Sequence, residues 1–201
     1  MNKREFTYRG ALTREQFLFQ ETRITARLIL EGLSDDEIRR KIMEENLFQY
    51  PTDKNIKSIS IACLRRLHLL SDSLIELVAN GSIYDAKQAV LYALMKDNKL
   101  IWDFMIYVIG EKYRTQDSSF SSQDINMFIN NLREQNDKVA SWSESTIVRI
   151  KSELRKILVE NDYLETSKST KLSYVLLGLQ LELELRNNNE ISVMSAFNHF
   201  E

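Results

Sequence analysis

Apolar residues recur every three or four positions along most of the chain, which is the spacing expected on one face of an α-helix. Many of these stretches follow a Ser, Thr or Asp that has an acid or Gln three positions later. Such a pair satisfies the free amides of a first helical turn. The pattern predicts helices that begin at or near Thr13, Ser34, Thr52, Ser71, Ser82, Lys99, Ser121 and Ser143. The chain is therefore expected to consist mainly of helices.

The last third of the chain follows a different order. A short helical piece at 137–142 precedes the predicted helix from Ser143 to Asn161, which is the order of a helix-turn-helix. Beyond it, residues 162–164 and 171–175 alternate like the two strands of a small β-hairpin, or wing. The predicted fold class is mainly α, with an N-terminal helical bundle and a C-terminal winged helix-turn-helix-like part that carries one small β-hairpin.

Composition supports this reading and suggests two domains. Five Gly and one Pro leave few residues for turns, and 43% hydrophobic with 28% charged residues is typical of a folded globular chain rather than a disordered one. Residues 1–115 form the predicted bundle, and residues 122–201 form the predicted winged-helix-like domain with its C-terminal helices. The polar segment 116–121, rich in Ser, is the predicted linker between them.

The residues offer little for catalysis or metal binding. A single cysteine, Cys63, cannot form an internal disulfide, and with His68 and His199 far apart no Cys/His zinc cluster can be assembled. A Gly-rich phosphate loop and a nucleophile with a neighbouring base are both unrecognisable in the sequence. We therefore predict no enzymatic activity, no metal and no cofactor.

The sequence also predicts a cytoplasmic protein. Its most apolar stretches, residues 100–110 and 172–181, are about half as long as the roughly 20 residues that a membrane-spanning helix needs. Residues 1–9 contain basic side chains with no apolar stretch behind them, unlike a signal peptide. These features favour core segments over membrane segments.

The predicted helix from Ser143 has two different faces. Ile147, Ile150 and Leu154 fall on an apolar face, while hydroxyl and basic residues fall opposite or beside it, with Glu153 as the one strongly exposed acid. A helix of this kind can place backbone amides on a phosphate and side chains at base edges, as a recognition helix does. The candidate DNA-binding residues of this helix and the wing are Ser143, Ser145, Thr146, Arg149, Lys151, Arg155, Lys156, Lys168 and Lys171.

A second basic stretch lies earlier in the chain. The cations between Lys54 and Leu70 face no acid in that interval, and they add four candidate DNA-binding residues: Lys54, Lys57, Arg65 and Arg66. The net charge of the whole chain is −2, however, and that of residues 137–171 is +1. Nucleic-acid contact, protein contact and a plain solvated helix face all remain open from the residues alone.

Several short motifs, in a consistent order and spacing, resemble a known family. They are Asn46, Leu47, Phe48 and Gln49; Arg65, Arg66 and Leu67; Asp103 and Phe104; Trp142, Ser143 and Thr146; and Ile157, Leu158 and Leu164. In these residues the chain resembles the BrxA proteins of bacteriophage exclusion (BREX) systems over nearly its whole length. One departure is the run from Asn161 to Tyr163, where the family has a Gly; Asn tolerates the left-handed conformation that a helix end requires.

The resemblance implies a cytoplasmic, all-helical, non-enzymatic component of antiviral defence that confers phage resistance. BrxA is encoded with a methyltransferase, an ATPase and a phosphatase-like protein, and it has been compared with the antitermination factor NusB. The implied function is binding of double-stranded DNA with little sequence specificity, and the implied partners are DNA and other BREX proteins. The alternatives are a protein adaptor, docking through the acidic, Leu-rich segment 176–186, and a NusB-like RNA binder. Some relatives have been described as inner membrane proteins, a description that this sequence does not support.

Overall fold

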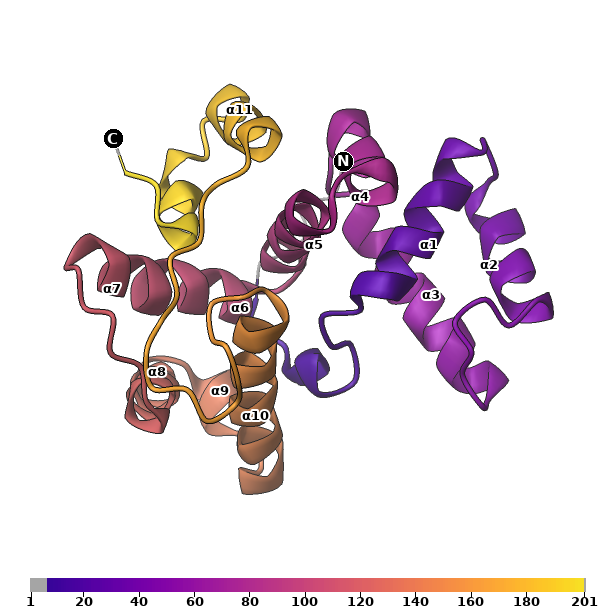
Figure 1. Cartoon of the computed structure of the whole chain (residues 1–201). Coiled ribbons are helices and arrows are strands. Elements are labelled where there is room, and N and C mark those ends of the chain that lie inside the picture. Colours follow the sequence, from indigo (N-terminus) through magenta and orange to yellow (C-terminus); the bar gives the residue numbers. More distant parts are fainter. Residues whose placement is uncertain (1–6, 201) are drawn as a thin grey trace. The chain divides into compact units, whose positions relative to one another are not determined.

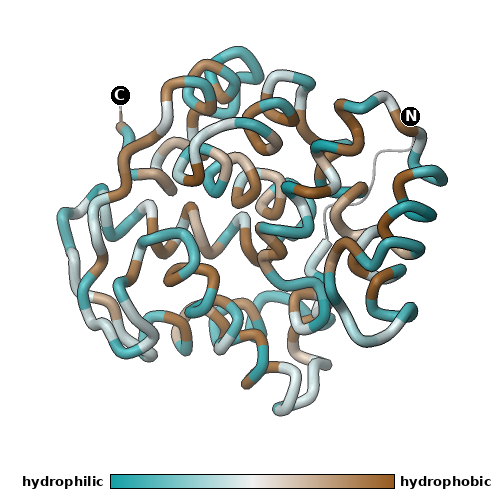
Figure 2. The backbone as a smooth tube through the Cα atoms, turned by 45° about the vertical axis from the view of Figure 1, so that its right-hand side comes forward, coloured by the Kyte–Doolittle hydropathy of each residue, from teal (hydrophilic) through white to brown (hydrophobic). Residues whose placement is uncertain are grey.

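The structure, a computed structural model, describes residues 7–200 and is mainly helical, as predicted (Figure 1). In chain order its helical elements are η1 (Gly10–Thr13), α1 (Phe19–Leu30), α2 (Asp35–Glu44), α3 (Asp53–Leu67), α4 (Asp72–Asn80), α5 (Ile83–Asp97), α6 (Lys99–Phe104), η2 (Met105–Gly110), α7 (Glu111–Arg114), α8 (Ser122–Gln135), α9 (Asp137–Ala140), α10 (Glu144–Glu160), α11 (Leu179–Asn187) and η3 (Ile191–Phe197). Hydrophobic and hydrophilic positions alternate along the helical turns (Figure 2), which is why one side of most helices is buried. Within the described residues, none of these helices is long and apolar enough to cross a membrane.

The chain divides into two compact units. Among the described residues, the larger unit contains 7–16 together with 98–200, and the smaller unit is Phe17–Asp97. The predicted linker, 116–121, lies inside the larger unit, where the amide of Phe120 donates a 2.9 Å hydrogen bond to the carbonyl oxygen of Thr170. The division into domains at 115 and 122 stays a prediction, and the packing of the chain divides at other positions.

The smaller unit is built from α1 to α5. Helix α1 packs against α3 and α4, α2 packs against α3, and α4 packs against α5. The core between α1, α2 and α3 is formed by buried residues: Leu18, Leu28, Ile38, Ile42, Phe48, Ile56, Ile59, Ala62, Cys63 and Leu64. Burial of this apolar surface is the main source of stability for the unit.

Capping residues begin the helices where the sequence predicts them. Ser34 accepts a hydrogen bond from the amide of Glu37, whose carboxylate accepts one from the Ser34 amide, so the two form a capping box at α2. Ser121 and Asp124 form the same arrangement at α8. Thr52, Ser71 and Ser143 cap α3, α4 and α10 through their hydroxyl oxygens.

The helix start predicted at Thr13 is wrong, because α1 begins six residues later, at Phe19. The Thr13 hydroxyl donates to the carbonyl oxygen of Gly10 within η1, so it is not available to cap a following helix. Leu18 then adopts a left-handed conformation with φ 59°, which interrupts the chain directly before α1.

The larger unit contains one continuous helical run, Lys99–Arg114, in which η2 is a π-helical turn between α6 and α7. Segment η3 packs against this turn. A side chain at Gly110 would bring its Cβ to 2.6 Å from the Oγ of Ser195, so the close approach of the two segments requires glycine. Helices α8, α9 and α10 follow, and α8 packs against both α9 and α10 (Figure 1).

The two predicted strands of the wing are not formed within the described part of the chain. The first arm turns inward instead: Asp162 adopts a left-handed conformation with φ 63°, and Tyr163 and Leu164 behind it are each 1% exposed. The left-handed position expected at the end of α10 is therefore occupied by Asp162 rather than by Asn161. Because the core takes up both apolar residues, the arm cannot extend as a strand.

The second arm pairs with a different partner from the one predicted. Lys171 forms an isolated antiparallel bridge with Ser119, and the amide of Leu172 donates a 2.7 Å hydrogen bond to the carbonyl oxygen of Ser118. A single link to the first arm is seen where the amide of Ser173 donates to the carbonyl oxygen of Tyr163, at 2.9 Å. The segment predicted as a linker thus supplies the partner that the predicted hairpin lacks.

Candidate nucleic-acid interface

Helix α10 separates its apolar and basic residues as the sequence predicts. Ile147, Ile150 and Leu154 are each at most 1% exposed and pack into the larger unit. Ser145 and Arg149 are exposed on the opposite side, which we call the outer face of α10. A helix that packs on one side and carries a cation on the other can present that cation to a ligand without losing core contacts.

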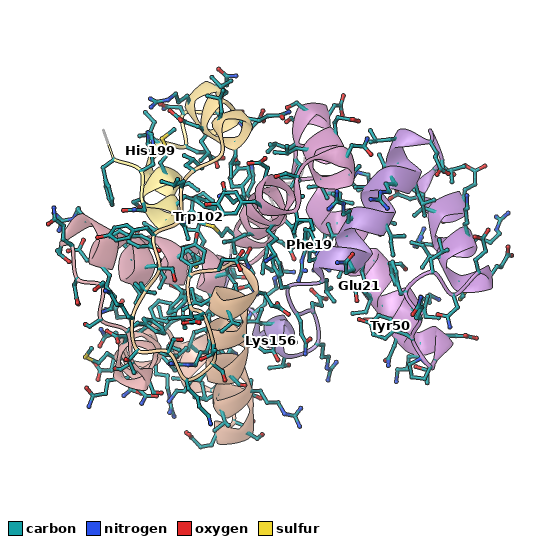
Figure 3. The ribbon with its side chains drawn as sticks, in the orientation of Figure 1. Phe19, Glu21, Tyr50, Trp102, Lys156 and His199 are labelled. Atoms are coloured by element: carbon teal, nitrogen blue, oxygen red, sulfur yellow. The ribbon has the colours of Figure 1, made fainter. Side chains whose placement is uncertain are left out.

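The chain before α1 runs along one flank of α10. Gly10 in η1 lies against Thr146, to whose Cγ2 a Cβ at residue 10 would come within 3.5 Å. Further along, the side-chain amide of Gln16 donates to Glu153 at 3.2 Å and its oxygen accepts from the Nζ of Lys156 at 2.8 Å. Figure 3 labels Lys156 on α10. Thr146 and Lys156 are therefore partly engaged by the protein itself.

Glu153 does not lie on the outer face, which corrects the prediction of a strongly exposed acid. Its side chain is half-buried beside Gln16, and its Oε2 is shielded from solvent with no hydrogen-bond partner in the described structure. Burial raises the pKa of the Glu153 carboxyl group, and the positive charge of Lys156 offsets part of that rise. With Glu153 withdrawn, the outer face is more basic than the sequence alone indicates.

The Glu153→Gln variant is expected to be more stable than wild type at neutral pH. The carboxyl group of Glu153 has a higher pKa in the folded state than in the unfolded state. The folded state therefore keeps its proton to a higher pH, and the stability of the wild-type protein falls as the pH rises above the pKa of the unfolded state. Glutamine keeps the contact with Gln16 and carries no charge, so this fall should disappear. Urea unfolding between pH 4 and pH 8 measures it, and an unchanged pH dependence would contradict the prediction.

Arg155 holds the predicted wing tip rather than facing solvent. Its Nε and Nη2 donate 2.5 Å hydrogen bonds to the carbonyl oxygens of Ser167 and Ser169, and its guanidinium lies 5.5 Å from the centre of the Phe120 ring. A guanidinium committed to two carbonyls and a ring is a structural clamp. These contacts give Arg155 a role in positioning the loop 165–170, and direct contact of Arg155 with DNA stays a prediction.

The two predicted wing lysines lie in the loop that Arg155 holds, as Lys168, and directly after it, as Lys171. Lys168 and Lys171 are both exposed, and the amide of Lys168 donates to the hydroxyl of Thr166 in a compact turn. Ser143 and Ser145 at the start of α10 are exposed as well, with their hydroxyls 3.0 Å apart. The loop cations and the outer face of α10 thus belong to the same unit, and Arg155 ties the loop to that helix.

A groove lies on the other flank of α10. It has a volume of about 600 Å³ and is lined by residues of α8, α10 and the loop 165–170: Ser122, Ile125, Asn126, Lys151, Ser152, Arg155, Lys156, Val159 and Ser167. Sequence reasoning placed Lys151, Arg155 and Lys156 on a basic helix but missed Ser122 and Asn126, because their nearness depends on how α8 packs. We call this cavity the α8–α10 groove.

The second basic stretch is divided by the structure. Lys54 and Lys57 are exposed on α3, but Arg66 is 1% exposed and donates to the carbonyl oxygen of Phe17. Arg65 forms a two-point ion pair with Asp97, at 2.8 and 2.7 Å. The prediction of phosphate contacts by Arg65 and Arg66 is therefore corrected, because both guanidinium groups are held by the smaller unit.

The single cysteine is built into the core of the smaller unit. Cys63 is completely buried, and burial raises the pKa of its thiol to about 11, so the thiolate is strongly disfavoured at neutral pH. The described residues contain no group of three or more His, Cys, Asp or Glu side chains that could hold a metal ion. What distinguishes the chain is therefore its basic helix face and its groove.

The fold and the candidate site define a class of protein. It is a mainly helical protein in which a group of three helices, α8, α9 and α10, exposes a basic helix face. Residues 7–189 match the family model described as BrxA. Two relatives named BREX protein BrxA are 33% identical over 168 residues, in Bacillus cereus, and 30% identical over 170 residues, in Paramagnetospirillum magneticum. The Bacillus cereus match covers 84% of this chain and 84% of the relative, and the Paramagnetospirillum magneticum match covers 85% of each. The chain therefore belongs to the BrxA family, which indicates a BREX system component.

Two further comparisons extend the match over more of the chain. A BREX protein BrxA of Escherichia coli is 26% identical over 195 residues, covering 97% of this chain and 92% of the relative. The crystal structure of an uncharacterized protein from Magnetospirillum magneticum superposes with a TM-score of 0.80 at 28% identity, covering 94% of this chain and 97% of the other. Both units are thus shared with these relatives.

Proposed function

We propose that this BrxA family member is a non-enzymatic component of a BREX defence system that binds double-stranded DNA with little sequence specificity. The observation that carries the proposal is the Arg155 clamp, because it holds against the basic helix α10 a loop that carries the exposed Lys168 and is followed directly by the exposed Lys171. Cations from two segments are thereby presented together, as phosphate binding requires.

We further propose that α8, α9 and α10 act as a winged helix-turn-helix, with loop 165–170 as the wing. The order of the three helices and the short α9 favour this assignment. The pairing of Ser119 with Lys171 supports it as well, because it ties the base of the loop to the segment directly before α8. In this arrangement α10 lies nearest the DNA, and Lys168 and Lys171 contact the neighbouring backbone.

Low sequence specificity follows from the residue types on the outer face. Arg149 is the long polar side chain there that could read a base edge, and Ser145 is a short hydroxyl residue that suits a phosphate contact. Val148, 64% exposed, adds an apolar contact without hydrogen-bonding capacity. Phosphate contacts then supply most of the affinity, which makes binding sensitive to salt.

The test is a double charge reversal, Arg149→Glu with Lys168→Glu, measured by fluorescence anisotropy with duplex DNA over a salt series. Both side chains are exposed, so folding should be unaffected. Affinity should fall by roughly tenfold or more, and the slope of log affinity against log salt should become shallower by about 2, since each lost phosphate contact removes about 0.9. Two unrelated duplex sequences should respond equally.

Two further variants locate the binding surface. Arg114→Glu makes one such charge reversal on α7, outside the proposed surface, and should bind duplex DNA like wild type. Lys54→Glu with Lys57→Glu reports on α3 in the smaller unit. The proposal is wrong if the α10 and loop variant folds normally and binds duplex DNA with wild-type affinity and salt slope. Tighter binding of RNA than of duplex DNA would favour the NusB-like alternative.

A protein adaptor is the second candidate function, and a specific observation favours it. Tyr174, Leu176 and Leu179 are each more than 70% exposed along one stretch of chain, and Leu183 on α11 is 52% exposed. Such clustered exposed apolar residues commonly mark a protein interaction site. The two candidates differ in the measurement above, because a pure adaptor does not bind duplex DNA at any salt concentration.

A further inference from the structure

We propose that the α8–α10 groove is a binding site for a free mononucleotide, separate from the outer face of α10 that we assign to DNA. The groove lies wholly within the larger unit, between the first turns of α8, the second half of α10 and the loop 165–170. Its volume of about 600 Å³ lies within the range of roughly 300 to 1,000 Å³ typical of small-ligand pockets.

Positive charge dominates the groove. Three of its nine lining residues are cations, Lys151, Arg155 and Lys156, and none of the nine is an acid. Two acids lie beside the groove rather than in its lining: the Oε1 of Glu160 is 3.9 Å from the Nζ of Lys156, and the carboxyl group of Glu153 also interacts with the charge of Lys156. The three cations come from one helix but flank a shared cavity, so their fields add at the position where an anion would lie.

Hydrogen-bond donors suited to a phosphate line the same cavity. Ser122 is the first residue of α8, a helix of fourteen residues whose first amides carry partial positive charge, and Ser152 and Ser167 add hydroxyl groups. Arg155 supplies an independent indication. Its Nη1 is shielded from solvent and has no hydrogen-bond acceptor in the described structure, although its other nitrogens donate to carbonyl oxygens.

A buried guanidinium donor without an acceptor is unfavourable, and native proteins rarely retain one unless an anion or water satisfies it. Phosphate oxygens are the strongest such acceptors for arginine. Arg155 lines the groove, and its shielded Nη1 is a donor that the described structure leaves unsatisfied. A small shift of the guanidinium would bring this nitrogen to a phosphate bound beside the two lysines.

The remaining lining residues indicate a base as well as a phosphate. Ile125 and Val159 give one part of the groove an apolar lining, and Asn126 lies on the same helix face as Ile125 and Ser122, one turn into α8. An Asn side chain donates and accepts at once, so it can pair with a nucleobase edge. The groove therefore offers cations and hydroxyl groups for the phosphate of a nucleotide. It also offers an apolar surface with one side-chain amide for the base.

Occupation of the groove would act on the loop. Arg155 joins the groove to loop 165–170 through the carbonyl oxygens of Ser167 and Ser169. A phosphate bound to the same guanidinium would hold its position, and with it the loop that carries Lys168. The ligand is thus expected to order the loop without touching the outer face.

The experiment is isothermal titration and NMR titration of the full chain with adenosine monophosphate, adenosine and inorganic phosphate. Adenosine monophosphate should bind, and adenosine and phosphate should each bind at least about tenfold more weakly, because each lacks one half of the contacts. Lys151→Glu should weaken nucleotide binding by a similar factor, and Lys151→Arg should retain it. Arg149→Glu, on the outer face of the same helix, is the matched control and should bind like wild type.

The results separate this proposal from DNA binding. Lys151 is partly exposed and has no recorded ion-pair partner in the described structure, so its variants should fold, and circular dichroism checks this. Lack of nucleotide binding at millimolar concentration, or equal binding by wild type and Lys151→Glu, would overturn the groove assignment whatever the duplex measurements give. Equal affinity for inorganic phosphate and the nucleotide would overturn the assignment of a base. If Arg149→Glu loses the nucleotide as fully as Lys151→Glu, the site is not the groove.

Discussion

The Asp97→Ala variant is expected to lose about 3–5 kcal/mol of stability, the range observed when one partner of a buried ion pair is removed. The Asp97 side chain is 3% exposed at the end of α5 and pairs with two arginines of α3. Arg65 donates to both of its oxygens, and the Nε of Arg66 lies 3.7 Å from Oδ2. Alanine would leave two guanidinium groups in the interior of the smaller unit without their carboxylate.

The loss should be local to the smaller unit. Urea unfolding gives the total change, and amide hydrogen exchange should show faster exchange in α3 and α5, which pack against one another. Lys54→Ala is the control, because this exposed residue begins the same helix and its truncation should change stability by less than about 0.5 kcal/mol. A change below about 1 kcal/mol for Asp97→Ala would mean that the pair is not desolvated as its burial implies.

The ion pair also shows where sequence reasoning fails. Lys54, Lys57, Arg65 and Arg66 are indistinguishable as cations in a stretch without acids, so the sequence predicts one basic surface. Two of the four share the carboxylate of Asp97, a residue more than thirty positions away. Helical periodicity assigns faces only within a helix, and it carries no information about a distant partner.

Local signals were reliable for helices and unreliable for the wing. Ser34, Ser121 and Ser143 begin helices as predicted because a cap is decided within four residues. The strand pattern after Asn161 fails because Tyr163 and Leu164 are both buried in the core. The side chains of consecutive residues in a strand would instead point to opposite faces. Strand pairing depends on which segment is nearby, and that is set by packing rather than by local pattern.

In the candidate site, too, some features could be predicted from the sequence and others could not. The apolar and outer faces of α10 follow from its periodicity, whereas the roles of Glu153 and Arg155 depend on neighbours outside the helix. Gln16 covers Glu153, and the carbonyl oxygens of the loop engage Arg155. Both neighbours lie outside any window in which a helix pattern can be recognised, so neither role could be predicted.

The Leu154→Ala variant is the second large effect expected, a loss of about 2–5 kcal/mol, which is the usual range for leucine truncated in a packed core. Leu154 is 0% exposed at the middle of α10, between Ile150 and Ile157, which are buried on the same face. Arg149→Ala, one and a half turns away on the outer face, should change stability by less than about 0.5 kcal/mol. Thermal and urea unfolding of the two variants measure the contrast directly.

The same pair of variants connects the fold of α10 to its proposed function. Arg149→Ala should weaken duplex DNA binding while the helix stays intact, because the side chain is exposed and absent from the core. Leu154→Ala keeps every cation but loosens the packing that holds Arg155 and its loop in place, so it should weaken binding only as the larger unit begins to unfold. Binding measured below and within the unfolding transition distinguishes the two effects. A Leu154→Ala protein that is as stable as wild type would show that α10 is not packed through this face.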